Sequence, residues 1–563
     1  MSNKHEIQSK KQDLSQSEAK ELAKWTVMVY FAADNDLEEE AIANLKMMKK
    51  VGSTNEVNLV AQLDSRGKGS TFRFLLQDEQ SSLDEDVVGD PLPEINTGDP
   101  RELSDFIKWG MKEYPAQNTM LVLWGHGRGW ENQDNADRAT PLVTDIVQYR
   151  DYQGDELKGW SVARTSSNEI RRFIRAGANN KTNLDNMLHA RGGYQYAGRY
   201  SGRYFIAGQF KDSDNEAVAG FLLDQTAKEA RESSQDVLRM DELNSALEQG
   251  LGGRTKNRID ILGMDACLMG MLEVGYQVRA CVNYLVATED TIPDDGWPYD
   301  RIFARLVECP DLSPEDLAAT IVREYLIHYR ELEKDVTKSA CNLNQSRPLI
   351  NALKELATDL TKKLSDDNLC VAVLGARATA QNFYLKDYVD LYDFCSKLEK
   401  LCLDERIKSG CARVMNAIRG NEKEEVGNSN NNFVSEYGFV GHRLRGSNGI
   451  SLYFPIVEPS TRYADLPFAK DSEWYAFLHK LARQFPEIEP SEDERADGGD
   501  EAGVKGGGNG SSAGCEGLKA CQGTEEKFGQ GMVQVVPPIR RRDCAAANGK
   551  EKRKRKVNRN RVH

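Results

Sequence analysis

Cys267 and His126 are the two residues of this chain best suited to act together in nucleophilic catalysis. Each follows an apolar run, His126 within Gly125-His-Gly-Arg-Gly129 and Cys267 within Asp265-Ala-Cys-Leu-Met-Gly270. A cysteine attacks as its thiolate, and a neighbouring histidine or a helix N-terminus favours that form. A histidine, with a reference pKa of about 6.5, can take the thiol proton and later return it to a leaving group. The residue types therefore indicate covalent thiol catalysis, with Cys267 as nucleophile and His126 as base.

The backbone around these two residues offers a further element of such a site. The glycines beside His126 let the chain approach a substrate closely. The amides of Gly127 and Cys267 would then stabilise an oxyanion. The local pattern alone is weak, because a cysteine after a strand is more often a packed thiol. The eleven cysteines are irregularly spaced, so neither a disulfide framework nor a zinc site is expected, and no metal ligands are assigned.

Apolar runs alternating with amphipathic stretches must position these residues. Near-continuous apolar strands between helices predict a mostly parallel sheet covered on both faces, with functional residues just beyond the carboxyl ends of the strands. The helix after the run at 258–264 is expected to begin near Cys267, and Asn35 or Asp36 is expected to cap the helix that follows the first strand. The expected strands are 25–32, 57–63, 71–76, 119–124, 258–264, 282–287 and 448–455, and the expected helices 37–50, 102–113, 238–247, 313–333, 346–365 and 385–402.

The chain divides into three parts by composition. Residues 1–24 form a polar leader, and 25–488 form one α/β domain. Within that domain, residues 131–238 are polar and weakly periodic and are interpreted as a long insertion. Residues 489–563 are Gly/Ser-rich and then basic, and this composition predicts disorder.

The net charge and the apolar runs bear on partners and location. The formal charge of -14 argues against nucleic acid as a partner, except through the basic C-terminal tail. No run approaches the roughly 18 apolar residues needed to cross a bilayer. The first 25 residues contain no signal-peptide core, so a cytoplasmic location is expected.

Several segments in a fixed order resemble the clostripain family of cysteine peptidases. The resemblance spans about 25–130 and 238–480. The segments are Trp25-Thr-Val-Met-Val-Tyr-Phe-Ala-Ala-Asp-Asn-Asp-Leu37, Trp124-Gly-His-Gly127, Asp265-Ala-Cys-Leu-Met-Gly270, Gly296-Trp-Pro-Tyr299 and Gly449-Ile-Ser-Leu-Tyr-Phe-Pro455, the last similar to the family's closing strand.

This resemblance implies a caspase-like α/β/α sandwich with His126 and Cys267 as a catalytic dyad. It implies protein or peptide substrates with Arg, less readily Lys, before the cut bond. Asp265 matches the family position that selects the cation, and Asp295 is a second candidate, with Asp290 as its alternative. Asp265 could also cap the next helix, and Asp36 could cap a helix or stand at the site edge.

The resemblance leaves cofactors and activation open. It implies no required cofactor and would allow a calcium effect, although the sequence holds no EF-hand-type loop. Many relatives are exported zymogens that cut themselves, and the Arg-rich 131–238 region would be suited to self-cleavage. The rival interpretation is a catalytically silent homologue that acts as a scaffold, against which the intact dyad motifs argue.

Overall fold

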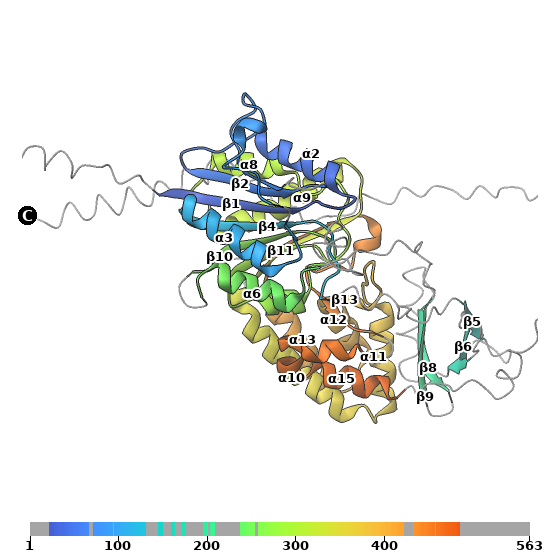
Figure 1. Ribbon diagram of the computed structural model, residues 1–563. Helices are drawn as coiled ribbons and strands as arrows, with labels where there is room; N and C mark the ends of the chain where they lie inside the picture. The colour runs from blue at the N-terminus through green and yellow to red at the C-terminus, as the bar shows by residue number, and fades with distance from the viewer. Residues whose placement is uncertain are drawn as a thin grey trace, which may run out of the picture.

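An eight-stranded sheet forms the centre of the protein, in the order β14-β12-β11-β10-β4-β1-β2-β3 (Figure 1). Five strands from β2 to β11 run parallel, whereas β3, and β12 with its neighbours, pair in antiparallel fashion. The bounds are β1 Ala23–Ala32, β2 Val57–Asp64, β3 Thr71–Leu75, β4 Ala116–Trp124, β10 Ile259–Asp265, β11 Val282–Ala287, β12 Val336–Asn342 and β14 Val434–Val440.

The computed structural model describes most of the predicted α/β domain. It covers residues 22–66, 71–93, 95–130, 237–253, 257–420, 432–455 and 458–484, and the backbone of five short strands between 145 and 208. Those strands are β5 Asp145–Tyr149, β6 Gly159–Ala163, β7 Arg172–Ile174, β8 Gln195–Tyr200 and β9 Arg203–Gly208. The predicted leader, except its last three residues, the rest of the predicted insertion and the predicted 489–563 tail lie outside the described residues.

Helices cover both faces of the sheet because its strands are apolar on both sides. Strand β1 sends Val27, Val29 and Phe31 into one core, and Met28 and Tyr30 into the other. The α/β/α sandwich with a mostly parallel sheet is thus confirmed. The first layer contains α2 Glu38–Lys49, α8 Tyr299–Glu308 and α9 Pro314–Glu331. The second contains α3 Pro100–Glu113, α6 Met240–Gly250, α7 Leu272–Val278, α10 Ser346–Lys363, α11 Asp367–Thr379, α12 Leu391–Leu401, α13 Glu405–Arg419, α14 Pro467–Ser472 and α15 Trp474–Ala482.

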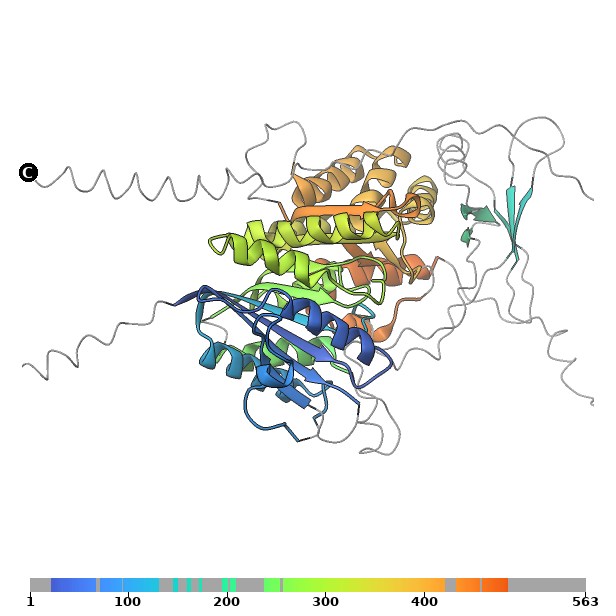
Figure 2. The same ribbon diagram turned by 90° about the horizontal axis from the view of Figure 1, so that it is seen from above.

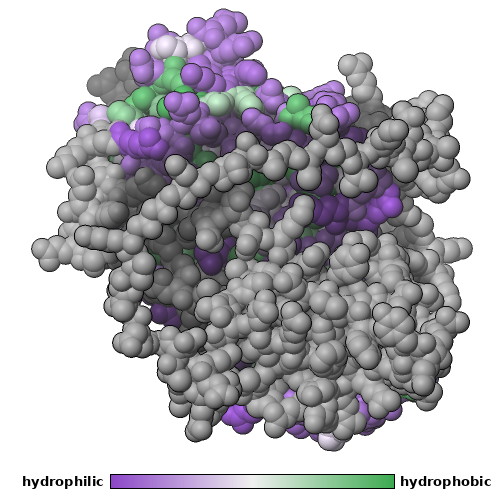
Figure 3. Space-filling view, turned by 90° about the vertical axis from the view of Figure 1, so that its right-hand side faces the viewer, coloured by the Kyte–Doolittle hydropathy of each residue, from purple (hydrophilic) through white to green (hydrophobic). Residues whose placement is uncertain are grey.

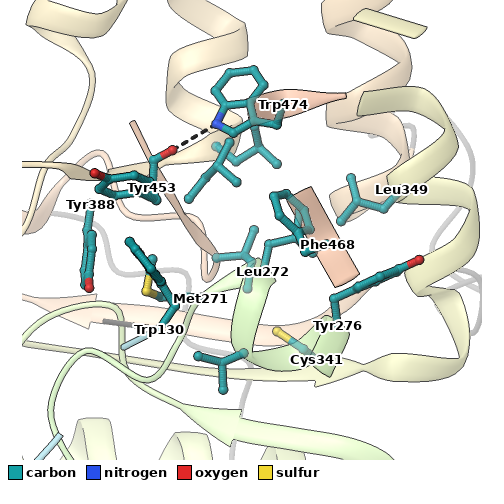
Figure 4. Close-up of a cluster of buried hydrophobic side chains, with 14 of the residues drawn as sticks. Trp130, Met271, Leu272, Tyr276, Cys341, Leu349, Tyr388, Tyr453, Phe468 and Trp474 are labelled. Atoms are coloured by element: carbon teal, nitrogen blue, oxygen red, sulfur yellow. Dashed lines mark hydrogen bonds between the residues drawn. The ribbon is translucent and has the colours of Figure 1, made fainter. Parts of the chain in front are cut away.

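The second layer extends into a large helical region whose apolar core is continuous with that face of the sheet. Seen from above, the N-terminal elements in blue lie at one end of the molecule and the orange helices at the other (Figure 2). Aromatic side chains fill this centre, and Trp474 Nε1 donates to the Tyr453 carbonyl at 2.9 Å (Figure 4). On the face in Figure 3 the coloured residues are mainly hydrophilic, with small apolar areas among them. In the part of the chain that the structure describes, no helix has the length and hydropathy to span a membrane.

The prediction of a strand over 448–455 is wrong for most of that range. Only Ser451–Tyr453 (β15) is extended, and it pairs with β13 (Tyr388–Asp390) in a separate two-stranded sheet. Two strands of the central sheet, β12 and β14, were not expected from the sequence. Strand β12 is buried along its whole length. Its sequence, Val-Thr-Lys-Ser-Ala-Cys-Asn, nevertheless contains polar residues and no apolar run, so no strand was predicted there.

Two buried carboxyls connect β13 to the end of β11. Glu289 accepts from the Gly449 amide at 3.1 Å, and Asp390 accepts from the Asn448 side chain at 3.0 Å. Burial raises the pKa of both groups, and the charge of Asp390 raises that of Glu289 further. The pair is therefore most stable with at least one proton bound.

We expect the stability of the fold to fall as pH rises because of this pair. An acid whose pKa is raised by folding contributes stability that is present below its unfolded pKa, about 4, and lost as pH rises through the folded value. Glu289→Gln keeps the shape of the side chain without its charge. Between about pH 5 and pH 8, the free energy of unfolding should therefore fall by on the order of 1–3 kcal/mol less in this variant than in wild type. Urea unfolding at both values checks this against Glu405→Gln on exposed α13 surface. Identical pH slopes in wild type and Glu289→Gln would contradict it.

Candidate active site

Two loops leave neighbouring parallel strands at the same edge of the sheet. Strands β4 and β10 pair in register, with Trp124 beside Asp265. The Gly125 amide donates to the Asp265 carbonyl at 3.2 Å, which joins the loops where they begin. His126 and Cys267 each stand two residues beyond these paired positions. The structure therefore brings the two predicted chemical groups to one place.

Gly127 packs directly on the backbone of Cys267. A Cβ at Gly127 would lie 2.3 Å from the Cys267 carbonyl oxygen and 2.8 Å from its nitrogen, so only glycine fits. Neither the Gly127 amide nor the Cys267 amide donates a hydrogen bond to another residue within the described part of the chain. Two adjacent amides without acceptors are what an oxyanion site requires.

Gly127→Ala should therefore separate the two loops and lower kcat/KM by about 100-fold, since a displacement of about 1 Å at a reacting centre costs that much. Peptidase kinetics and a thermal melt check the change together. Gly410→Ala on α13 is the matched control, because its Cβ meets a flexible Leu356 methyl at 3.0 Å far from the loops. Wild-type kinetics in Gly127→Ala would show that the contact does not matter.

The thiol of Cys267 lies at the surface of the site, partly exposed. Its sulfur accepts a hydrogen bond from the Ile292 amide at 3.2 Å. Burial raises the pKa of the Cys267 thiol to about 11, against the lowering effect of the Ile292 amide, and the charges of Asp290 and Asp265 raise it further. A thiol in this state is protonated at neutral pH, so it needs a base before it can attack.

The helix expected to begin near Cys267 begins later. Helix α7 starts at Leu272, and Leu268 adopts a positive φ of 65° in the loop between. The Leu268 and Gly270 amides donate to the Asp290 and Thr288 carbonyls, so the loop bonds to the chain after β11. The prediction that a helix begins near Cys267 and activates its thiol is therefore wrong.

His126 directs its imidazole at Asp36. Its Nε2 lies 2.7 Å from Asp36 Oδ1, and the His126 side chain is 19% exposed, so a substrate can reach it. Partial burial raises the pKa of Asp36, but the hydrogen bond and charge of His126 outweigh this and hold it below its usual value. Of the two roles open for Asp36, the structure places it at the site edge. The expected cap is absent, since Leu37 precedes α2 without a side-chain cap bond.

Asp265 is buried beneath the Cys267 loop. Its Oδ2 accepts from the Trp297 amide at 3.0 Å and the Tyr299 hydroxyl at 2.8 Å, whereas Oδ1 has no hydrogen-bond partner among the described residues. Burial raises the pKa of Asp265, and the charge of Lys338 acts in the opposite direction. Asp265 does not cap α7, which starts seven residues later.

The other two acids predicted for the site have partners of their own. Asp295 is exposed and pairs with Lys334 at 3.5 Å. Asp290 is buried, pairs with Arg443 at 2.6 Å and accepts from the Tyr384 amide at 2.9 Å. Within the described ranges, neither carboxylate makes a hydrogen bond or ion pair with Asp265. Of the three acids, Asp265 is the one that is buried and makes no ion pair within those ranges.

The model of the clostripain family matches residues 29–157 and 230–481, more than half of the chain. The chain belongs to the clostripain family. It is therefore placed among cysteine peptidases, whose catalytic cysteine would be supplied here by one of the loops described above.

The chain is similar to several characterised proteins. Clostripain of Hathewaya histolytica is 22% identical over 521 residues, covering 82% of this chain and 81% of that protein. A secreted C11 cysteine protease from Bacteroides thetaiotaomicron, solved with an irreversible peptide inhibitor, has 17% identity and a TM-score of 0.47, covering 81% of this chain and 99% of that one. An inactive zymogen C11 protease from Parabacteroides distasonis has 18% identity and a TM-score of 0.46, covering 80% and 98%.

The segments that resemble the clostripain family gather around this site. The first supplies Asp36, and the second and third supply the two loops. Trp297, from the fourth, binds Asp265. Ser451, from the last, donates its amide to the Gly270 carbonyl at 2.9 Å and so holds the end of the Cys267 loop. Segments that are far apart in the sequence therefore contribute to the same site.

Proposed function

We propose that this clostripain-family chain is an endopeptidase that cleaves after Arg, and less readily after Lys, through a thioester. The observation that supports this best is the contact between Gly127 and the Cys267 backbone, which holds the histidine and cysteine loops against each other. The proposal assigns Cys267 as nucleophile, His126 as base and then acid, and the Gly127 and Cys267 amides as oxyanion donors.

The chemistry proceeds in two balanced steps. His126 takes the Cys267 proton as sulfur attacks the carbonyl carbon, and the oxyanion forms against the two amides. The carbon–nitrogen bond then breaks, and the proton on the imidazole leaves with the amine. Water, deprotonated by His126, next attacks the thioester and releases the acid and the thiol. Asp36 supports the imidazolium that exists between these transfers, because its carboxylate bonds to Nε2.

Asp265 is proposed to select the substrate's cation. Its Oδ1 is free of partners among the described residues and buried, so a guanidinium that reached it would gain a charge-assisted hydrogen bond away from water. Asp295 is proposed as a second acid that binds the substrate cation at the rim of the same site, because it lies two residues before Trp297, which binds Asp265. Its exposed ion pair with Lys334 would have to break first.

A panel of matched fluorogenic peptides with Arg, Lys, Asp or Asn before the reporter tests the proposal. We expect the order Arg, then Lys, with little cleavage after Asp or Asn, and loss of all cleavage in Cys267→Ala. Asp265→Asn should lose about 10- to 100-fold on the Arg peptide, the worth of one charged hydrogen bond. Preferred cleavage after Asp would refute the specificity, and undiminished cleavage in Cys267→Ala would refute the mechanism.

Self-cleavage within 131–238 is proposed as the activation step. That region contains Arg138, Arg150 and Arg164 among several others, and it begins immediately after the His126 loop. Purified wild type should therefore appear as two fragments on a denaturing gel and Cys267→Ala as one band. Identical single bands from both proteins would contradict this step.

The proposed mechanism assigns no step to a cofactor. No group of three potential ligands that could hold a metal occurs in the described part of the chain. Calcium remains a proposal by family resemblance, and activity with and without a chelator is the assay that decides it.

A further inference from the structure

Lys338 is a buried cation that the proposed mechanism does not use. It lies on β12, two strands from β10, and is 1% exposed. Its Nζ stands 4.4 Å from the centre of the Trp297 ring and 4.3 Å from that of Tyr325. No hydrogen-bond partner for Nζ is present among the described residues. A Lys ammonium between two aromatic faces and without an acceptor is an expensive arrangement, which an apolar side chain would avoid.

Lys338 and Asp265 face the same part of the site. Trp297 connects them, because its ring lies against the Lys338 ammonium and its amide binds Asp265. Each charge favours the other, since the Lys338 charge lowers the pKa of the buried Asp265 and the Asp265 charge raises that of Lys338. Both Asp265 Oδ1 and Lys338 Nζ lack a hydrogen-bond partner in the described part of the chain. The carboxylate thus already has a cation of the chain's own within electrostatic reach.

This arrangement bears on how a substrate cation could bind. A guanidinium that approaches Asp265 meets the repulsion of the Lys338 ammonium in a region of low dielectric constant, where charge interactions are strong. If Lys338 loses its proton, the repulsion disappears and Asp265 is left with a full charge to satisfy. The incoming arginine would then replace Lys338 as the counter-ion.

We propose that Lys338 is a specificity-determining residue: it is the resident counter-ion of Asp265, and arginine binds there only as Lys338 gives up its proton. This inference rests on the proposed role of Asp265. It makes the preference for arginine over an uncharged side chain dependent on pH and on Lys338.

The direction of the pH effect follows from the surroundings of Lys338. Burial lowers the pKa of Lys338 far below its usual value, toward neutral pH, and the charges of Asp265 and Cys267 raise it in part. The titratable groups that act on it are Asp265 and Cys267 from β10 and its loop, and Tyr325 from α9. Burial raises the pKa of all three, that of Asp265 to about 6 and that of Cys267 to about 11, so the lysine is the group that exchanges a proton most readily above neutral pH. Arginine preference should therefore increase as pH rises.

Kinetics with a charged and an uncharged substrate test the inference. The measured quantity is the ratio of kcat/KM for a peptide with Arg to that for the same peptide with citrulline, which has the shape of Arg without its charge. We expect the ratio to rise about tenfold between about pH 6 and pH 8.5 in wild type, the change expected when one proton must leave. In Lys338→Arg, whose guanidinium keeps its proton across this range, the ratio should be low and constant. Lys354→Arg on α10, at an exposed lysine that pairs with Glu473, is the matched control.

A binding experiment keeps the inference separate from catalysis. In Cys267→Ala, calorimetry with a peptide ending in argininamide, in buffers of different ionisation enthalpy, should show proton release near pH 6. The Cys267→Ala, Lys338→Arg double variant keeps a cation that cannot give up its proton, so it should bind the peptide more weakly and release fewer protons. Thermal melts establish that both variants fold. Equal proton release and equal affinity in the two proteins would overturn the inference. Absence of any Cys267-dependent cleavage would instead refute the proposed function and leave this comparison to decide the role of Lys338.

Discussion

Cys267→Ala is expected to abolish peptide cleavage, lowering kcat/KM by about 10³-fold or more, as loss of a covalent nucleophile does. The substitution removes one sulfur atom whose hydrogen bonds in the described structure are to the backbone of Ile292, from its amide and to its carbonyl. The Gly127 contact involves the Cys267 backbone and is retained. The loss should therefore be chemical rather than structural, with an unchanged thermal melt.

Cys281→Ala is the control for this change. Cys281 is a buried thiol just before β11, outside the site. Its replacement should leave the kinetics near those of wild type, with a small loss of stability. Cleavage that survived Cys267→Ala but failed in Cys281→Ala would move the nucleophile and contradict the mechanism. Cleavage lost in neither variant would favour the silent-homologue interpretation, with a contaminant as the source of activity.

His126→Ala is expected to lower kcat/KM by about 10²- to 10⁴-fold, the range for loss of a general acid–base group. The effect should be large here because burial raises the pKa of the Cys267 thiol to about 11, so few molecules carry a thiolate without a base. Raising the pH should restore part of the rate in His126→Ala, since hydroxide can then remove the thiol proton. This partial rescue is a readout that mere misfolding would not produce.

Asp36→Asn tests whether Asp36 only positions the His126 imidazole or is itself needed for proton transfer. Asp36 is 64% exposed, so its bond to His126 competes with water and we expect a smaller loss than in His126→Ala. His479→Gln, on α15 and paired with Glu458, is the histidine control and should retain full activity. An equal loss in Asp36→Asn and His126→Ala would show that the carboxylate is as essential as the imidazole and would contradict a role limited to positioning.

Much of the central sheet was predictable because its strands are continuous apolar runs. The predicted runs at 57–63 and 282–287 correspond to β2 and β11 within one residue. The carboxyl-end rule for parallel sheets also placed His126 and Cys267 correctly, since β4 and β10 are neighbours. To apply this rule, it was enough to know that each residue directly follows a strand in the sequence.

The rest depended on contacts that leave no local pattern. The polar strand β12 has no apolar run, so Lys338 could not be placed beside Asp265. The bond from Asp36 to His126 joins residues ninety positions apart. The late start of α7 follows from hydrogen bonds between the Cys267 loop and the chain after β11, which no propensity reports. Sequence order predicts strand ends well and cross-strand electrostatics poorly.

The most direct test of the central claim is the site of covalent attack. Wild-type protein is treated with a peptide chloromethyl ketone that carries Arg before the reactive carbon, and the adduct is located by mass spectrometry of its fragments. We expect one adduct, on Cys267, that forms much more slowly in His126→Ala and does not form when the peptide carries Asp. An adduct on another cysteine with loss of activity, or unimpaired activity in a protein fully labelled at Cys267, would contradict it.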